Sequence, residues 1–171
     1  MRTVLVIFGE LTDQDVDWLI AKGVKQAKKQ GEVLIKKDVP IDSLYIVLTG
    51  EFSVWIDEKR EISRAGSGEM LGEMSLLEAR PPGATVKAAT ASDVLAVPKQ
   101  QLQQRLKSDA AFAARFYKAL GMLLSFRLRR LTYKAGGRDE DAELADELDP
   151  NVLDTVFLAG SRFDRMLKKL G

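Results

Sequence analysis

The stretch Gly68–Leu77 (GEMLGEMSLL), followed after three residues by Pro81–Ala88 (PPGATVKA), decides how this chain folds. Glycine turns lead into a Gly-Glu pair, a short turn of helix, a proline-containing loop and a strand. At the start of such a helical turn the backbone N–H groups point toward one spot and can hold an anion. Glu73 beside them can accept a hydrogen bond from a sugar hydroxyl group. The stretch therefore predicts a site for a small anionic ligand.

On both sides of this stretch, residues 25–97 have the pattern of short β-strands separated by turns. The apolar segments are rich in β-branched and aromatic residues, which favour strands. Glycine, proline and aspartate mark turns between them at short intervals. Many short strands of this kind predict a sandwich, a roll or a barrel. The clearest predicted strands are Val33–Ile35, Leu44–Leu48, Phe52–Ile56 and Val94–Val97.

Helices flank the predicted strands. Thr12 and Asp15 form a capping box in Leu11–Val24, which predicts a short amphipathic helix there. A second helix is predicted over Gln100–Leu106, and a long one over Asp109–Lys134. At 1.5 Å per residue the long helix extends for about 39 Å, more than a roll of this size can cover. We therefore expect some of its turns to pack on the strands and others to meet a partner. Its apolar stripe contains Phe112, Phe116, Leu120, Leu123 and Leu124.

The remaining part of the chain is acidic. Gly136 and Gly137 predict the end of the long helix, seven carboxylates follow in Asp139–Asp149, and Asn151–Leu170 has the pattern of an amphipathic helix. We expect that helix to dock within the chain or in a dimer. The sequence thus divides into a body (1–135), an acidic linker (136–150) and a C-terminal helix (151–171).

Charge is distributed unevenly between these parts. Residues 1–138 carry a net charge of +6 and residues 139–171 a net charge of −5, which together give the overall +1. A nearly neutral chain of this kind does not have the charge of a general nucleic-acid binder. Basic residues gather near the end of the long helix, and we expect them to pair with the acidic segment: Arg127, Arg129, Arg130 and Lys134.

The chain contains no histidine and no cysteine. Catalysis by Ser-His-Asp or Cys-His groups, disulfides and zinc-thiolate sites are therefore excluded. We predict no catalytic residues, no metal site and no cofactor other than a possible nucleotide ligand. No apolar run approaches the roughly 20 residues of a membrane span, so we expect a cytoplasmic protein without membrane insertion.

The order and spacing of these features over residues 11–134 resemble the cyclic nucleotide-binding domain family. The resemblance rests on the leading helix, on LYIVLTGEFSV (residues 44–54), on the Gly72-Glu73 stretch and on the long helix behind it. It implies an α+β fold, an eight-stranded antiparallel, jelly-roll-like β-roll with a leading helix, a cassette helix and a long C-terminal helix. Transcription factors of this type continue into a helix-turn-helix module, which the remaining residues here do not resemble.

The resemblance also implies roles for individual residues. Gly72 matches the ribose-contacting glycine, Glu73 the carboxylate that binds the ribose 2′-hydroxyl, and Ala84 a small residue beside the phosphate. The arginine that pairs with the phosphate in the family falls on Pro82, although Arg80 lies close by in the sequence. The ligand-binding residues predicted on this basis are Gly72, Glu73, Met74, Ser75, Arg80, Gly83, Ala84 and Thr85.

Two functions follow as hypotheses. In the first, the chain is a non-catalytic sensor that binds cyclic AMP, cyclic GMP or a similar small anion and relays binding through its long helix to a protein partner. In the second, the site is degenerate and the chain is an adaptor or dimerisation module. Glu73 favours the first and Pro82 favours the second. In either case we expect a homodimer through the long helix and no nucleic-acid partner.

Overall fold

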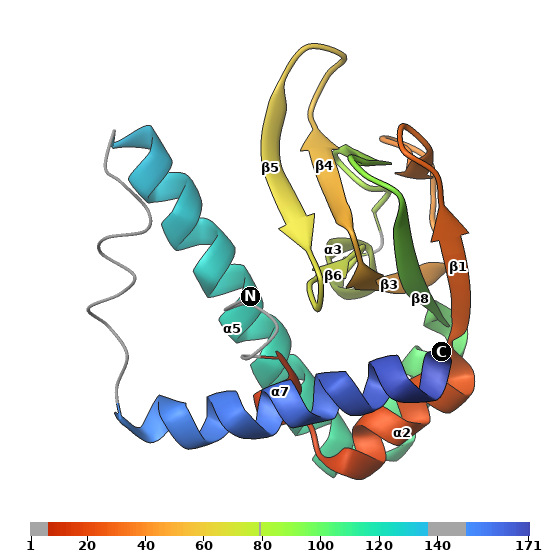
Figure 1. Ribbon diagram of the computed structural model, residues 1–171, viewed down its shortest axis with the longest axis vertical. Coiled ribbons are helices and arrows are strands. Elements are labelled where there is room, and N and C mark those ends of the chain that lie inside the picture. Colours follow the sequence, from red (N-terminus) through yellow and green to blue (C-terminus); the bar gives the residue numbers. More distant parts are fainter. Residues whose placement is uncertain (1–6, 79, 137–149) are drawn as a thin grey trace.

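The computed structural model describes residues 7–78, 80–136 and 150–171. Its strands form two four-stranded antiparallel sheets, which confirms the predicted eight-stranded α+β roll (Figure 1). The first sheet has the order β1 (Val24–Lys28), β8 (Ser92–Pro98), β3 (Ser43–Thr49), β6 (Met70–Leu71). The second has the order β2 (Val33–Ile35), β7 (Thr85–Ala88), β4 (Glu51–Trp55), β5 (Glu61–Gly66).

Strand β3 joins the two hydrophobic cores of the molecule. Successive side chains of a strand point to opposite faces. Accordingly Leu44 and Ile46 pack in a core shared with the helices, whereas Tyr45 and Val47 pack inside the roll. All residues from 44 to 48 are buried, which explains why this strand is a continuous apolar run instead of an alternating one.

The helices gather at one end of the roll, apart from the short α3 (Met74–Leu77) that follows β6. The predicted capping box is confirmed, since the Thr12 hydroxyl accepts from the Asp15 N–H and the Asp15 carboxylate accepts from the Thr12 N–H. The remaining helices are α2 (Asp13–Lys22), α4 (Lys99–Ser108), α5 (Ala110–Ala135) and α7 (Pro150–Leu170).

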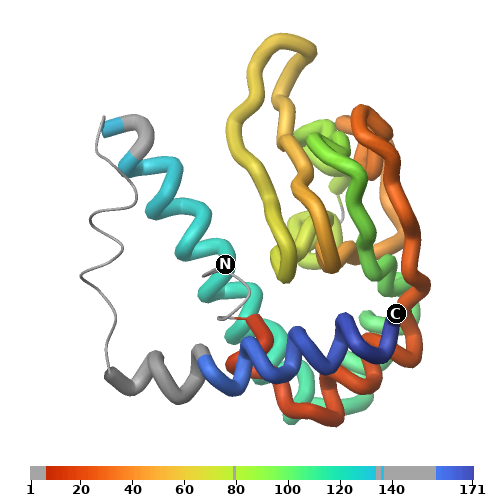
Figure 2. The backbone as a smooth tube through the Cα atoms, in the orientation of Figure 1, coloured from red at the N-terminus to blue at the C-terminus, as the bar shows by residue number. Residues whose placement is uncertain are grey.

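Helix α7 lies across α2, as the tube in Figure 2 shows. Ala159, Phe163 and Met166 are buried in the core shared with the helices, and the Phe163 ring centroid lies 5.4 Å from that of Phe8. Arg162 Nε also donates to Asp13 Oδ1 at 2.7 Å. The apolar face of the C-terminal helix thus docks within the chain. The acidic segment predicted as a linker falls largely on residues 137–149, outside the described residues, so the division of the chain there stays a prediction.

Helix α5 changes character along its length. Phe112, Phe116 and Leu120 in its first half are buried in the core shared with the helices, as predicted for part of its stripe. In its second half Leu128 is 66% exposed and Leu131 48% exposed. This second half extends away from α2 along the open side of the roll (Figure 1). The expected partner of these turns stays a prediction.

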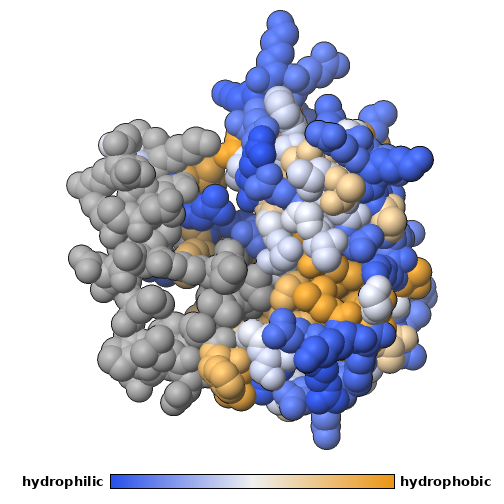
Figure 3. All heavy atoms as spheres, viewed as in Figure 1, coloured by the Kyte–Doolittle hydropathy of each residue, from blue (hydrophilic) through white to orange (hydrophobic). Residues whose placement is uncertain are grey.

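The face seen in Figure 3 is mostly hydrophilic over the hairpin between β4 and β5, and hydrophobic atoms gather where the roll meets the helices. Within the described parts of the chain, no helix has both the length and the apolar character that crossing a membrane requires.

Candidate functional site

The Gly72-Glu73 turn has a backbone that requires glycine. Gly72 has φ +86°, in the left-handed region that residues with a Cβ rarely adopt, and a Cβ there would lie 2.7 Å from Ile41 Cδ1. The turn carries the chain from β6 directly into α3, whose first N–H groups have no acceptor within the helix. The glycine therefore allows the tight turn that brings Glu73 and the start of α3 to the same side of the roll.

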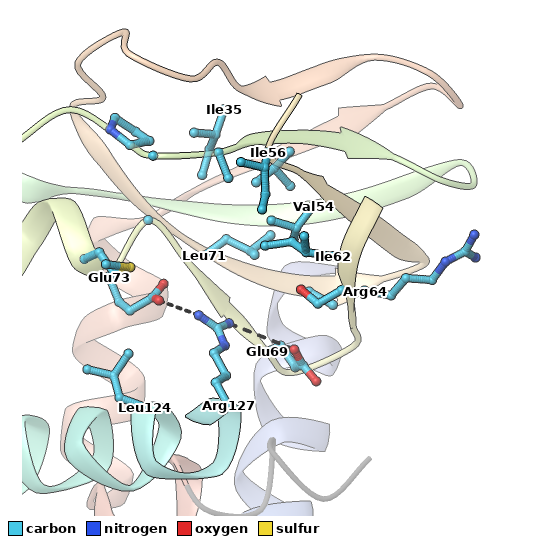
Figure 4. Close-up of a pocket in the computed structure, with 18 of the residues that line it drawn as sticks. Ile35, Val54, Ile56, Ile62, Arg64, Glu69, Leu71, Glu73, Leu124 and Arg127 are labelled. Atoms are coloured by element: carbon cyan, nitrogen blue, oxygen red, sulfur yellow. Dashed lines mark hydrogen bonds and ion pairs between the residues drawn. The ribbon is translucent and has the colours of Figure 1, made fainter. Parts of the chain in front are cut away.

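Glu73 is a buried carboxylate with a partner from a distant part of the sequence. The residue is only 4% exposed, and its Oε1 accepts a hydrogen bond from Nη1 of Arg127 on α5. Arg127 also donates from Nη2 to the carbonyl oxygen of Met70, and that Nη2 lies 4.0 Å from Glu69 Oε2. Figure 4 shows the guanidinium between the two carboxylates. This ion pair keeps a charged Glu73 compatible with burial.

Only one oxygen of Glu73 is used in this arrangement. Among the residues that the structure describes, Oε1 is the carboxylate atom that accepts a hydrogen bond. Its second oxygen, Oε2, therefore retains its capacity to accept a hydrogen bond from another group. A carboxylate fixed by an arginine on one oxygen can hold a hydroxyl group on the other.

Glu73 lies in the wall of a cavity of about 1080 Å³ between the roll and α5. The strands contribute an aliphatic wall above the Glu73–Arg127 pair, and α5 closes the cavity from below (Figure 4). Such a combination of apolar walls with a few fixed polar groups is typical of small-molecule sites. The aliphatic side chains from the strands include Ile35, Val54, Ile56, Ile62, Leu71 and Val86.

The structure brings most of the predicted ligand-binding residues together. Gly72, Glu73, Met74, Ser75, Gly83 and Ala84 all line the cavity. Arg80 and Thr85 do not: Arg80 is exposed to solvent, and the Thr85 hydroxyl accepts a hydrogen bond from the Lys37 N–H at 3.1 Å. The suggestion that Arg80 could reach the site is therefore not supported by its position, and the binding roles of the other residues stay predictions.

Pro82 also lines the cavity, at the position where the family pattern has its arginine. Its carbonyl oxygen accepts a hydrogen bond from the Asp38 N–H at 2.9 Å, which fixes the loop against the turn after β2. A proline has neither a side-chain donor nor a backbone N–H. The loop thus offers no cation to a phosphate at this position.

Arg127 is the site residue that the sequence did not identify. We expected it to pair with the acidic segment after Gly137, which falls outside the described residues. Among the described residues, Arg127 pairs with Glu73 and donates to the carbonyl oxygen of Met70. The basic run at the end of the helix was the only signal in the sequence. Which of its members faces the roll depends on how α5 is oriented against β6, and sequence spacing does not specify that orientation.

A second buried carboxylate connects α5 to α2. Asp15 is 1% exposed, and its oxygens accept from Arg105 Nη2 at 2.8 Å and from Arg115 Nε at 2.8 Å. Burial opposes ionisation of this carboxyl group, but the hydrogen bonds from Arg115 and Thr12 outweigh it and hold the pKa of Asp15 below its ordinary value. Since Arg115 and Arg127 both belong to α5, one helix carries an arginine partner of each carboxylate.

The sequence model of the cyclic nucleotide-binding domain matches residues 25–109. The Pycsar effector protein BcPycTIR of Burkholderia cepacia is 35% identical over 77 residues, which cover 44% of this chain and 25% of that protein. The type II regulatory subunit of cAMP-dependent protein kinase of Drosophila melanogaster is 23% identical over 116 residues, covering 68% of this chain and 30% of that protein.

Solved structures of the family have the same fold. A cyclic nucleotide-binding domain from Methylobacillus flagellatus superimposes with a TM-score of 0.67 at 23% identity, covering 86% of this chain and 84% of that one. The chain spans only 25% to 32% of the length of the curated relatives that it matches. Through residues 25–109, with their β-roll and the Gly72-Glu73 turn, this chain belongs to the cyclic nucleotide-binding domain family.

Proposed function

We propose that this chain is a non-catalytic regulatory domain that binds a cyclic nucleotide, or a small anion of similar shape, in the cavity between the roll and α5. The observation that carries the proposal is Glu73. Its carboxylate is 4% exposed, lies in the wall of a cavity of about 1080 Å³, and has one oxygen engaged by Arg127. A buried charge held in this way at a cavity wall is a candidate ligand contact.

The groups around the cavity suggest how the ligand would lie. A ribose hydroxyl would donate to the second oxygen of Glu73, and the N–H groups at the start of the Met74–Leu77 turn would face the cyclic phosphate. The base would lie against aliphatic side chains such as Val54, Ile62 and Val86. Regulatory relatives such as the kinase regulatory subunit support the sensor role for this chain as well.

The proposed relay passes through Arg127. A ligand that hydrogen-bonds to Glu73 changes the electrostatic environment of the Glu73–Arg127 pair, and Arg127 belongs to α5. The position of α5 is in turn linked to α2 through Arg115 and Asp15. A ligand with different affinities for two positions of α5 would shift the population between them and alter a protein partner's contact.

One observation favours the alternative, a domain that no longer binds nucleotide and acts as an adaptor. Pro82 lies in the cavity wall at the position of the family arginine. Leaving a charge without its partner in a buried site costs about 3–5 kcal/mol. At about 1.4 kcal/mol per tenfold change, this corresponds to two to three and a half orders of magnitude in affinity.

Titration calorimetry with purine and pyrimidine 3′,5′-cyclic nucleotides tests the proposal. We expect weak binding to the wild-type chain and binding at least a hundredfold tighter to Pro82→Arg. The matched control is Glu78→Arg, which adds the same side chain at an exposed position outside the cavity and should leave the affinity unchanged. Failure of both the wild type and Pro82→Arg to bind would favour the adaptor, and tight binding by the wild type would contradict the expected role of Pro82.

The predicted homodimer would form through the part of α5 near Tyr117. That side chain is 49% exposed, and a Cβ placed on Gly121, one turn later, would meet no other atom within 4 Å. A second helix can approach closely at such a position. Sedimentation equilibrium should show a dimer for the wild type and a monomer for Tyr117→Glu, with Gln101→Glu on α4 as the control. A wild-type chain that stays monomeric at high concentration would exclude the dimer.

A further inference from the structure

Glu69 is a further buried carboxylate in the wall of the cavity. The residue is 8% exposed and directly precedes strand β6, whereas Glu73 follows the same strand after Gly72. Its backbone is fixed on both sides, because the Glu69 N–H donates to the carbonyl oxygen of Gly66 at 3.1 Å and the Glu69 carbonyl oxygen accepts from the Val47 N–H at 2.9 Å. The position of Glu69 at the cavity is therefore set by the sheet.

The Glu69 carboxylate accepts no hydrogen bond from the residues that the structure describes. Its Oε2 lies 4.0 Å from Arg127 Nη2, which is beyond hydrogen-bond distance. The two Nη atoms of Arg127 donate instead to Glu73 and to the carbonyl oxygen of Met70. Arg127 therefore hydrogen-bonds to one carboxylate of the cavity and only lies beside the other. Both oxygens of Glu69 retain their capacity to accept hydrogen bonds.

The other charged side chains in the cavity wall are engaged already. Arg64 on β5 is paired with Glu61 and with Glu51, both at 2.7 Å. Arg130 has an interaction of its own. A ligand that fills the cavity and displaces water from Glu69 must therefore bring its own donors, because a buried carboxylate left without hydrogen bonds is costly.

Glu69 lies at the end of the cavity where the base of the proposed ligand would be. Figure 4 shows Glu69 and Glu73 on opposite sides of the Arg127 guanidinium, with Glu69 on the side of β5 and Ile62 above it. In the proposed arrangement the ribose is at Glu73 and the base packs against Val54 and Ile62. The base then extends from Glu73 toward β5, and Glu69 is the buried carboxylate on that side.

The common bases differ in the donors that they can offer to a carboxylate. Guanine has its N1–H and its 2-amino group side by side on one edge, and two parallel donors match the two oxygens of a carboxylate. Adenine and cytosine each offer one amino group beside a ring nitrogen that is an acceptor. Uracil offers one N–H between two carbonyl groups. Of these four bases, guanine alone presents two adjacent donors.

We propose that Glu69 recognises the base of the bound nucleotide and makes the cavity selective for a cyclic nucleotide of guanine. Its two oxygens would accept from the N1–H and the 2-amino group, while the ribose donates to Glu73. A wrong base would leave Glu69 without donors or place an acceptor against it, and a site built to hydrogen-bond its ligand discriminates strongly against such analogues. The inference rests on the proposed nucleotide-binding function and adds to it the identity of the base.

Titration calorimetry with three nucleotides tests the inference in the Pro82→Arg background. Cyclic IMP is the matched ligand, because it retains the N1–H but lacks the 2-amino group. We expect cyclic GMP to bind at least tenfold more tightly than cyclic AMP, with cyclic IMP between them. Glu69→Gln should weaken cyclic GMP binding at least tenfold and change cyclic AMP binding by less than threefold. Glu61→Gln, a carboxylate of the same wall that is paired with Arg64, is the control and should preserve the preference.

A spectroscopic measurement separates recognition of the base from a structural role of Glu69. In complexes with ¹⁵N-labelled cyclic GMP, the N1–H proton should be protected from exchange with water, and Glu69→Gln should remove this protection. If Glu69→Gln does not fold, equal affinities for cyclic GMP and cyclic IMP with Glu69 intact would still overturn the inference.

The outcomes also distinguish this inference from the proposed function. Equal binding of cyclic GMP and cyclic AMP, or a preference that Glu69→Gln leaves unchanged, would overturn the role of Glu69 while nucleotide binding itself stands. Failure of all three nucleotides to bind to the wild type and to Pro82→Arg would overturn both.

Discussion

Asp15 and Glu73 are both buried carboxylates whose partners include an arginine of α5, yet their surroundings differ. Asp15 is 1% exposed and accepts hydrogen bonds from Arg105, Arg115 and the Thr12 N–H. Glu73 is 4% exposed, accepts from Arg127, and lies in a cavity wall. The first carboxylate is enclosed by its partners and joins helices. The second retains an oxygen for a ligand, and this difference separates a structural ion pair from a candidate binding group.

Removing the charge of Asp15 should produce the largest effect. Asp15→Asn removes the carboxylate of Arg115 and leaves Arg105 with only Asp109, whose Oδ2 lies 3.6 Å away. We expect this loss to cost about 3–5 kcal/mol of the free energy of unfolding. Urea unfolding followed by circular dichroism measures it. The control is Asp13→Asn in the same helix. The Asp13 carboxylate is 61% exposed and paired with Arg162, so this substitution should lower the free energy of unfolding by at most about 1 kcal/mol. If both variants lose the same free energy of unfolding, the burial of Asp15 among its partners does not add to its contribution to stability.

The corresponding change at Glu73 should affect binding more than folding. In the Pro82→Arg background, where the affinity is measurable, Glu73→Gln should weaken cyclic nucleotide binding about tenfold to a hundredfold, as expected for loss of a charge-assisted hydrogen bond worth about 1.5–3 kcal/mol. Titration calorimetry provides the measurement. Glu61→Gln, which removes another carboxylate from the cavity wall, is the control and should leave the affinity unchanged. An unchanged affinity in Glu73→Gln would remove Glu73 from the ligand site.

Removing the partner of Glu73 should cost less stability than the change at Asp15. Arg127→Met preserves the length of the side chain but leaves the Glu73 carboxylate unpaired, at an expected cost of about 1–3 kcal/mol in the free energy of unfolding. The cost is limited because water in the cavity can solvate the carboxylate. Arg129→Met, two residues away and near the Phe126 ring, is the control. If Arg127→Met destabilises the chain as much as Asp15→Asn does, the two carboxylates are not distinguished by solvent access.

The smallest effect should be a dependence of stability on pH that belongs to Asp15. Its pKa is lower in the folded chain than the value of about 3.9 in an unfolded chain, so the folded state holds the ionised form more strongly. Its contribution to stability is complete above about pH 4–5 and is lost as the pH falls through the lowered pKa. The difference in unfolding free energy between wild type and Asp15→Asn should therefore shrink below pH 4. A constant difference down to pH 2 would contradict this assignment.

Much of the fold could be predicted from local sequence signals. Thr12 and Asp15 predicted a capping box because the residues that form it are three positions apart, and the structure contains both of its hydrogen bonds. The buried strand β3 was visible as a continuous apolar run, and Gly72 was visible because a tight turn requires a residue without a Cβ. Each of these features depends on residues that are neighbours in the chain.

The predicted site residues come together in the structure where they belong to one segment, and their binding roles stay predictions. Six of the eight predicted residues line the cavity, and they lie on one turn and one loop between positions 72 and 84. Arg80 is in the same loop, but the direction of its side chain depends on how the loop packs, and the structure leaves it in solvent. The sequence also did not show that α7 would cover α2.

The sequence by itself determined a domain of many short strands flanked by helices and the turn that presents Glu73, because local propensity and glycine geometry act over short distances. Its resemblance to the family added the eight-stranded roll and the absence of the family arginine at Pro82. Only the tertiary structure decided that Arg127, 54 positions from Glu73, would neutralise it. The same is true of the cavity between the roll and α5. These features depend on the rotation of one helix against a sheet, and that rotation is set by the packing of side chains contributed from the whole chain.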